Sequence, residues 1–254
     1  MKIALAVNLV TPDTAVNLDE IAALAGQAAA AGAQVVCFGE AAATGLINTD
    51  DPQHDRCVGQ AIPGPIVDRM REVSMSLGIW VAMGILECDG RRMYDAAVLL
   101  SPAGAVAMKY RRNDPRWHGR HAEPAIYCQG SEVLKAETEF GSFAFVICGD
   151  LWGDNVRRRV RALRPDWLLH PFQRSFSDGS RDQAKWEREE LPEYTRLISE
   201  IGIPTFATSY ISSGDLAVEG DAFGGAMVFS GQGEVIAQQP LGTRGILFFD
   251  TEGS

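Results

Sequence analysis

Cys148 is the residue whose type and setting most suggest chemistry. It follows the apolar run 143–147 (FAFVI) and precedes Gly149 and Asp150. A cysteine at the end of a strand, where the chain turns toward a helix, can present its sulfur at the edge of a sheet. The backbone N–H groups beyond it can then face a developing oxyanion. Most cysteines are instead small buried apolar residues, so the local sequence leaves both interpretations open.

A nucleophilic thiol needs a base, and Glu40 is the best candidate. It follows the apolar run VVCF, at the carboxyl end of a predicted strand, where α/β folds gather their sites. A carboxylate in a mostly apolar pocket has a raised pKa and can take a proton from a thiol. Glu40 could equally be a helix-capping or surface acid. A Cys–His arrangement with His118, His121 or His170 is also open, although nothing in the local sequence marks it.

The elements that must position these residues alternate between strand-like and helix-like patterns. Strands are expected over 3–10, 34–38, 79–86, 93–100, 105–110, 143–148, 166–170, 205–210, 224–229, 234–238 and 245–249. Asn17 is predicted to cap the first helix, with Glu20 as its capping-box partner, and Pro65 and Gly78 bound the second. Further helices are expected over 157–163 and 183–200. We see no repeat or linker, and we expect one α/β domain over residues 1–254.

Composition excludes several classes of function. The 254-residue chain has a net charge of −10 and a pI near 4.9, which argues against a nucleic-acid partner and against docking on anionic lipid. An arginine run at 157–164 is expected on the solvated face of a helix. The apolar start MKIALAVNLV is too short to span a membrane. Five scattered cysteines without a CxxC pair suggest reduced thiols, a cytoplasmic setting and no zinc framework.

Four segments, taken in order, resemble those of the nitrilase-like carbon–nitrogen hydrolases. VVCFGEAAATG is similar to the family segment FPE-x-x-x-T-G, which carries the glutamate base; Glu40, Thr44 and Gly45 fit, and Gly39 replaces the proline. FGSFAFVICGDLWGD resembles the nucleophile segment around Cys148. GRRMYDAAVLLSPAGAVAMKYRR and FGGAMVFSGQGEVIAQ resemble the hairpin before the Y-R-K motif and a late hairpin. The order and spacing of these segments are more specific than any one of them.

This resemblance implies both a fold and a reaction. The fold is a four-layer αββα sandwich, usually paired into homodimers or higher homo-oligomers. In the reaction the thiolate of Cys148, with Glu40 as base, attacks an amide or nitrile carbon, ammonia or an amine leaves, and water hydrolyses the thioester. The expected substrate is a small amide or N-carbamoyl compound, and the sequence does not decide between amide and nitrile. The resemblance implies no metal and no organic cofactor.

The match departs from the family at the third catalytic residue. The lysine of Y-R-K is replaced by Arg112, and Lys109 cannot simply substitute because three positions along a strand reverse the face. Arginine can hold a positive charge near an oxyanion, but its pKa is too high for it to give up a proton. Hydrolysis, an altered choice of substrate, a non-catalytic protein that binds a small molecule or partner, and amide acyl transfer all stay open.

The resemblance points to further site residues. Glu123 stands where many members carry a second glutamate, with a role in positioning Arg112 or holding the substrate amide; an exposed loop acid is the alternative. Trp152, four residues past the nucleophile, walls the pocket or belongs to the core. Gly149 offers its backbone N–H toward the substrate. His118, with its neighbours Arg116 and Trp117, is expected near the entrance.

Overall fold

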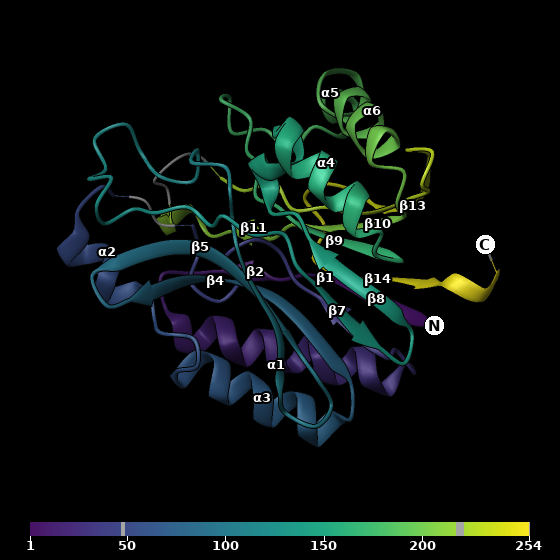
Figure 1. Ribbon diagram of the computed structural model, residues 1–254, viewed down its shortest axis with the longest axis horizontal. Helices are drawn as coiled ribbons and strands as arrows, with labels where there is room; N and C mark the ends of the chain where they lie inside the picture. Colours follow the sequence, from purple (N-terminus) through teal and green to yellow (C-terminus); the bar gives the residue numbers. More distant parts are fainter. Residues whose placement is uncertain (47–48, 217–220, 254) are drawn as a thin grey trace.

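Two mixed six-stranded sheets stack face to face, and helices cover both outer faces (Figure 1). The computed structural model describes residues 1–46, 49–216 and 221–253. The arrangement is the α/β nitrilase fold, so the predicted four-layer αββα sandwich is confirmed. No helix in the described part of the chain is both long and apolar enough to cross a membrane.

The first sheet has the order β14-β1-β3-β4-β5-β6 and carries helices on one face. Its strands are β1 (Lys2–Val7), β3 (Val35–Cys37), β4 (Trp80–Asp89), β5 (Arg92–Leu100), β6 (Val106–Arg111) and β14 (Gly245–Asp250). Helices α1 (Thr14–Ala30) and α3 (Pro65–Leu77) cover its outer face, and they lie together below the sheets in Figure 1. Both faces of the sheet are therefore buried, which explains the nearly continuous apolar run of β1.

The second sheet has the order β13-β12-β10-β9-β8-β7. Its strands are β7 (Lys135–Thr138), β8 (Gly141–Phe145), β9 (Trp167–Pro171), β10 (Thr205–Thr208), β12 (Ala226–Phe229) and β13 (Val235–Gln239). Helices α4 (Asp154–Leu163), α5 (Gln183–Glu189) and α6 (Leu191–Ile201) lie on its outer side. Along α4, Arg158 and Arg161 are exposed while Val156 and Val160 are buried, so most of the arginine run faces solvent as predicted.

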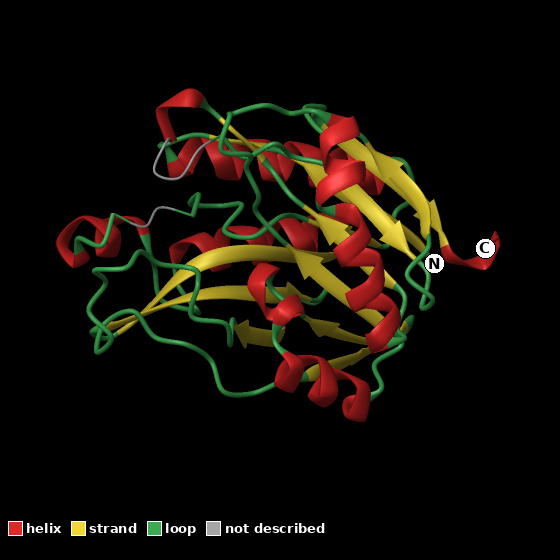
Figure 2. Cartoon of the chain, turned by 90° about the horizontal axis from the view of Figure 1, so that it is seen from above, coloured by secondary structure: helices red, strands yellow, loops and turns green. Residues whose placement is uncertain are grey.

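Short elements complete the chain. They are the paired strands β2 (Leu9–Val10) and β11 (Ile211–Ser212), the helix α2 (Pro52–Val58), and the 3₁₀ turns η1 (Cys148–Trp152), η2 (Gly214–Leu216) and η3 (Thr251–Gly253). The two ends of the chain meet at one side of the molecule (Figure 2). The amino group of Met1 donates to Thr251 Oγ1 at 3.0 Å, so the last turn closes against the first strand.

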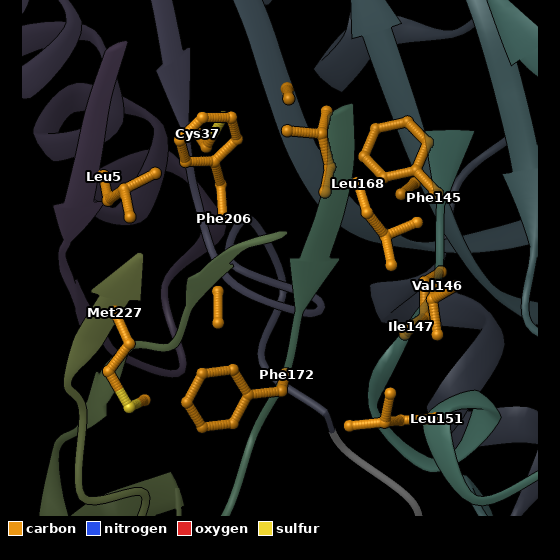
Figure 3. Close-up of a cluster of buried hydrophobic side chains, with 14 of the residues drawn as sticks. Leu5, Cys37, Phe145, Val146, Ile147, Leu151, Leu168, Phe172, Phe206 and Met227 are labelled. Carbon is orange, nitrogen blue, oxygen red and sulfur yellow. The ribbon is translucent and has the colours of Figure 1, made fainter. Parts of the chain in front are cut away.

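The main core fills the space between the sheets. Figure 3 shows Leu5 and Cys37 of the first sheet facing Phe206 and Leu168 of the second. These side chains are at most 3% exposed. Alternate residues of β1 divide between the two layers, because Leu5 joins this core while Ala4 packs under the helices.

Two predicted helix boundaries are wrong. The first helix is capped by Asp13, whose side chain accepts from the N–H groups of Ala15 and Val16. Asn17 is buried inside the helix, where its amide donates to the carbonyls of Thr11 and Ala43. These two hydrogen bonds link the start of α1 to a distant loop, and a local capping pattern cannot reveal such tertiary contacts.

The long helix predicted over 183–200 is two helices, α5 and α6. The break falls at Glu190, which has φ −110°, just before the second helix begins with Leu191 and Pro192. Pro192 has no backbone N–H to donate to the carbonyl of Arg188, four residues back, and its ring would clash with that carbonyl, so one helix cannot run through this point. Helix α2 and strand β7 were not predicted, because both are short segments in a region without clear periodicity.

Candidate active site

Glu40 lies just beyond β3, in a loop that crosses directly over β4. The N–H of Gly84 donates to the carbonyl of Gly39 at 3.1 Å, and a Cβ on Gly84 would lie 2.2 Å from the backbone nitrogen of Ala41. Only glycine lets the two backbones approach this closely. Ala41 itself has φ +46°, so the chain turns sharply just after Glu40 and leaves that carboxyl fully buried.

We predict that Gly84→Ala lowers both stability and activity. The added methyl group meets backbone atoms of Gly39 and Ala41, which cannot move aside without shifting Glu40. We expect a loss of about 1–3 kcal/mol in the free energy of unfolding, measured by urea denaturation, and a parallel fall in kcat. Gly26→Ala in α1 is the matched control, since nothing lies within 4 Å of its new Cβ. Equal stability of the two variants would contradict this account of the crossing.

Cys148 occupies the turn between β8 and α4, where it begins η1. Its φ of +39° is unusual for a residue with a side chain, and only 8% of the residue is exposed. Its sulfur lies 3.5 Å from the carbonyl oxygen of Gln173. A strained backbone that points a thiol at a cavity is typical of functional sites, because the surrounding structure must hold it in place.

Asp150 fixes this turn and joins it to the segment after β6. Its Oδ2 accepts from the N–H of Ile147 at 3.2 Å and from the hydroxyl of Tyr110 at 2.6 Å. Its Oδ1 accepts from the N–H groups of Asn113 and Asp114 at 2.9 and 2.7 Å. Four donors thus bind the buried carboxyl group of Asp150. This carboxyl group holds the turn at Cys148 against β6 and the segment that follows it.

Arg112 follows β6 and reaches three carboxylates. Its Nη1 lies 2.6 Å from Oε1 of Glu40 and 3.4 Å from Oδ2 of Asp95, and its Nη2 lies 3.2 Å from Oδ1 of Asp114. The guanidinium is almost completely buried, with 3% of the side chain exposed. Gly149 makes room for it, since a Cβ there would lie 2.3 Å from Nη2 of Arg112.

Burial sets the electrostatics of Glu40. It raises the pKa of this carboxyl to about 8; Cys148 also raises it, whereas Arg112 lowers it. The thiol and the guanidinium therefore act on the pKa of Glu40 in opposite directions. A carboxylate whose pKa lies near neutral pH is well matched to taking a proton and returning it.

A cavity of about 410 Å³ opens above the thiol. It is lined by Leu46, Arg112, Arg116, Cys148, Gly149, Trp152, Gln173, Arg174, Ser175, Glu189, Glu190 and Glu193. Half of these residues carry charged side chains, of both signs, which indicates a polar ligand. Within the described ranges, no three His, Cys, Asp or Glu side chains are grouped so as to hold a metal ion.

The predicted site residues divide into two groups. Arg112, Cys148, Gly149 and Trp152 line the cavity, and Glu40 lies behind the guanidinium of Arg112. Trp152 is both wall and core, because its ring also packs edge-on against Tyr194 at 5.0 Å.

The remaining predicted residues lie elsewhere among the described residues. Glu123 is exposed, and its carbonyl accepts from Ile126 and Tyr127 in a loop turn. The ring of His118 packs near Trp117 and Tyr127 rather than against the cavity.

Lys109 points away from the cavity, as its odd spacing from Arg112 predicts. Its Nζ forms an ion pair with Glu87 of β4 at 2.7 Å. The cation beside Glu40 is therefore Arg112. Neither a bulge nor a shift in register brings Lys109 to this place.

Sequence reasoning missed Asp95 and Asp114. Asp95 stands in the middle of β5, in the run MYDAAVLL, and is fully buried. A carboxylate inside an apolar strand is a usable signal, since buried charges are normally paired. Asp114 follows Arg112 by two residues and is half-buried between Arg112 and Arg116.

Comparisons with known proteins give the family and the fold of the chain. The sequence model of the carbon–nitrogen hydrolase family matches residues 2–252. Omega-amidase NIT2 from Xenopus tropicalis is 24% identical, covering 91% of this chain and 81% of that protein. Nitrilase 3 from Arabidopsis thaliana is 29% identical over 54% of this chain, but the match spans only 43% of that relative.

A solved structure shares the fold over nearly the whole chain. It is a variant of the amidase from Nesterenkonia sp. AN1, whose active-site cysteine has undergone Michael addition of acrylamide. It superposes with a TM-score of 0.81 at 20% identity and covers 98% of this chain and 92% of that one. This likeness concerns the fold, and the family match adds the sequence evidence. The chain belongs to the carbon–nitrogen hydrolase family.

Proposed function

We propose that this protein hydrolyses the carbon–nitrogen bond of a small polar amide or N-carbamoyl compound through a thioester on Cys148. The observation that carries the proposal is a thiol and a guanidinium that line one cavity, with a buried carboxyl in contact with the guanidinium. Cys148 and Arg112 line the cavity, and Glu40 lies 2.6 Å from the guanidinium of Arg112. A thiol, a carboxyl with a pKa of about 8 and a fixed cation are the parts that acyl transfer to sulfur requires.

The first half-reaction forms the thioester. Glu40 takes the proton of the thiol as the sulfur attacks the carbonyl carbon of the substrate. The negative charge that develops on the carbonyl oxygen faces Arg112 and the backbone N–H of Gly149. The carbon–nitrogen bond then breaks, and the leaving amine takes the proton back from Glu40. Arg112 keeps its own protons throughout, so the substitution of arginine for lysine leaves this proton cycle intact.

The second half-reaction releases the acid. Glu40 removes a proton from a water molecule, which attacks the carbonyl carbon of the thioester. The carbon–sulfur bond breaks, and the proton returns from Glu40 to the sulfur of Cys148. One water molecule is consumed and one amine and one carboxylic acid are formed, with the enzyme restored.

The lining of the cavity supports a polar substrate. The lining contains the positively charged side chains of Arg116 and Arg174 and the negatively charged side chains of Glu189, Glu190 and Glu193. The amidase from Nesterenkonia sp. AN1, which shares the fold, reacts with acrylamide at its active-site cysteine. That precedent favours small amides over larger peptides for this chain.

The test is a panel of small amides and N-carbamoyl compounds with two readouts, released ammonia and the mass of the intact protein. We expect ammonia from at least one compound, together with an added acyl mass on the peptide that contains Cys148. The exposed thiol of Cys57 is the internal control, since a nonspecific reaction would modify it first. Hydroxylamine in place of water would yield a hydroxamate if acyl transfer dominates. The proposal fails if no compound releases ammonia and Cys148 acquires no adduct.

A further inference from the structure

Asp95 is a buried acid that the reaction described above does not use. It lies in β5 opposite Leu86 of β4, and its carbonyl accepts from the N–H of Arg112 at 2.9 Å. Its Oδ2 lies 3.4 Å from Nη1 of Arg112, the nitrogen that also holds Glu40 at 2.6 Å. Neither Asp95 nor Glu40 is exposed to any degree. Two carboxyl groups therefore compete for one side of a single guanidinium.

The surrounding groups do not offset a second negative charge. Asp114 shares Arg112 but is held mainly by Arg116, whose Nη2 lies 2.8 Å from its Oδ2. On the far side, Asp150 accepts hydrogen bonds from Tyr110 and from three backbone N–H groups.

Two further groups face the pair from other elements. Tyr210 lies near both Glu40 and Asp95 as a neutral phenol, because burial raises its pKa, and Cys148 stands beside Glu40. Among the described residues, Arg112 is the cation in contact with both buried carboxyls. If both were ionised, one of the two buried negative charges would lack a positive partner, which is unfavourable in a buried site.

We propose that Asp95 retains a proton and donates it in a hydrogen bond to Glu40, so that Asp95 is a positioning residue for the base. The consequence for turnover rests on the proposed function, whereas the protonation of Asp95 does not. Above the pKa of Glu40, Arg112 then balances one anion, Glu40. The proton that moves during the reaction passes between Cys148 and Glu40, and the proton of Asp95 is never consumed.

Hydrogen bonding supports this assignment. Within the described part of the chain, Oε2 of Glu40 and Oδ1 of Asp95 are buried and have no donor. Two carboxylates offer acceptors only, so a proton on one of them supplies a donor that the pair otherwise lacks. Burial raises the pKa of Asp95 well above its usual range, and the charge of Glu40 raises it further. The hydrogen bond from Asp95 acts in the opposite direction on Glu40 and lowers its pKa.

Asparagine and alanine at this position separate the two possible charge states. The amide of Asp95→Asn can donate to Glu40 as a neutral carboxyl does, so we expect kcat/KM within about threefold of wild type. The acid limb of its pH–rate profile, which the pKa of Glu40 sets, should keep its midpoint near pH 8. Asp95→Ala removes the donor, and we expect kcat/KM to fall about 10- to 100-fold with the midpoint about one to two pH units higher.

An ionised Asp95 predicts the opposite pattern. In that case Asp95→Asn removes a negative charge beside Glu40, and the acid limb moves to lower pH. A shift in that direction, or a loss in Asp95→Asn as large as in Asp95→Ala, overturns the proposal.

An infrared measurement tests the protonation of Asp95 without turnover. We would record wild-type protein with ¹³C-labelled aspartate at about pH 9.5, above the pKa of Glu40. We expect a C=O band of a protonated carboxyl that shifts with the label and disappears in Asp95→Asn. If no such band exists, Asp95 is ionised and the proposal is wrong. A band in a protein that releases no ammonia would leave Asp95 protonated and refute only the hydrolase function.

Discussion

Replacing Cys148 with alanine is expected to abolish the release of ammonia, with kcat reduced by about 10⁴-fold or more. In the proposed reaction the thiol forms the covalent bond to the substrate, and no other thiol lines the cavity within the described residues. The backbone should stay as it is, since alanine and cysteine meet the same cost at a φ of +39°. We therefore expect a fold as stable as wild type within about 1 kcal/mol.

The measurement is ammonia release under saturating amide, paired with thermal unfolding of each variant. Cys57→Ala is the matched control, because it removes an exposed thiol in α2 that does not line the cavity. Its activity should equal that of wild type. Appreciable turnover in Cys148→Ala, with an intact fold, would show that the thioester route is wrong.

The second large effect is expected at Arg112, where even lysine should be a poor replacement. The guanidinium holds Glu40 and Asp95 through Nη1 and Asp114 through Nη2. A single ammonium cannot span these positions, so one or more of the acids loses its partner. We expect Arg112→Lys to lower kcat/KM about 10- to 100-fold, which is the usual cost of a charge-assisted hydrogen bond.

Arg112→Ala should lower kcat/KM further, by about 100- to 1,000-fold, because the positive charge that faces the oxyanion is lost. It also leaves a buried carboxylate unpaired, which destabilises a fold by about 3–5 kcal/mol. The two variants are compared by kcat/KM and by urea denaturation, with Arg158→Lys on the exposed side of α4 as control. A large gain in hydrolysis for Arg112→Lys would contradict this view. It would mean that arginine disables an ancestral site.

The positions of Cys148 and Glu40 could be predicted because each follows an apolar strand at the point where the strand ends. Sheet geometry brings such ends together, and the ordered family segments identified which ends matter. The partners of Arg112 could not be found in the same way. Glu123 occupies a suitable place in the sequence, yet Asp95 and Asp114 hold the guanidinium. The contact with Asp95 depends on the register between β5 and β6, which spacing along the chain does not report.

Local patterns failed in the fold for a similar physical reason. Asn17 carries the residue type of a helix cap, but its amide serves a carbonyl at Ala43 in the finished structure. Asp13, four residues earlier, satisfies the same local rule and is the cap that forms. Where two nearby residues both suit a role, tertiary contacts decide between them. The break at Glu190, by contrast, was readable from Pro192.

Cys148 and its proposed base, Glu40, are positioned by different sheets. Cys148 follows β8 of the second sheet, whereas Glu40 and Arg112 follow β3 and β6 of the first. The apolar layer between the two sheets includes Leu5, Phe145 and Phe206 (Figure 3). Its thickness therefore helps to set the distance between Cys148 and Glu40, over which a proton moves in the proposed reaction. A methyl group added or removed in this layer would change that distance, so the packing of the core affects the rate of the proposed reaction as well as the stability of the fold.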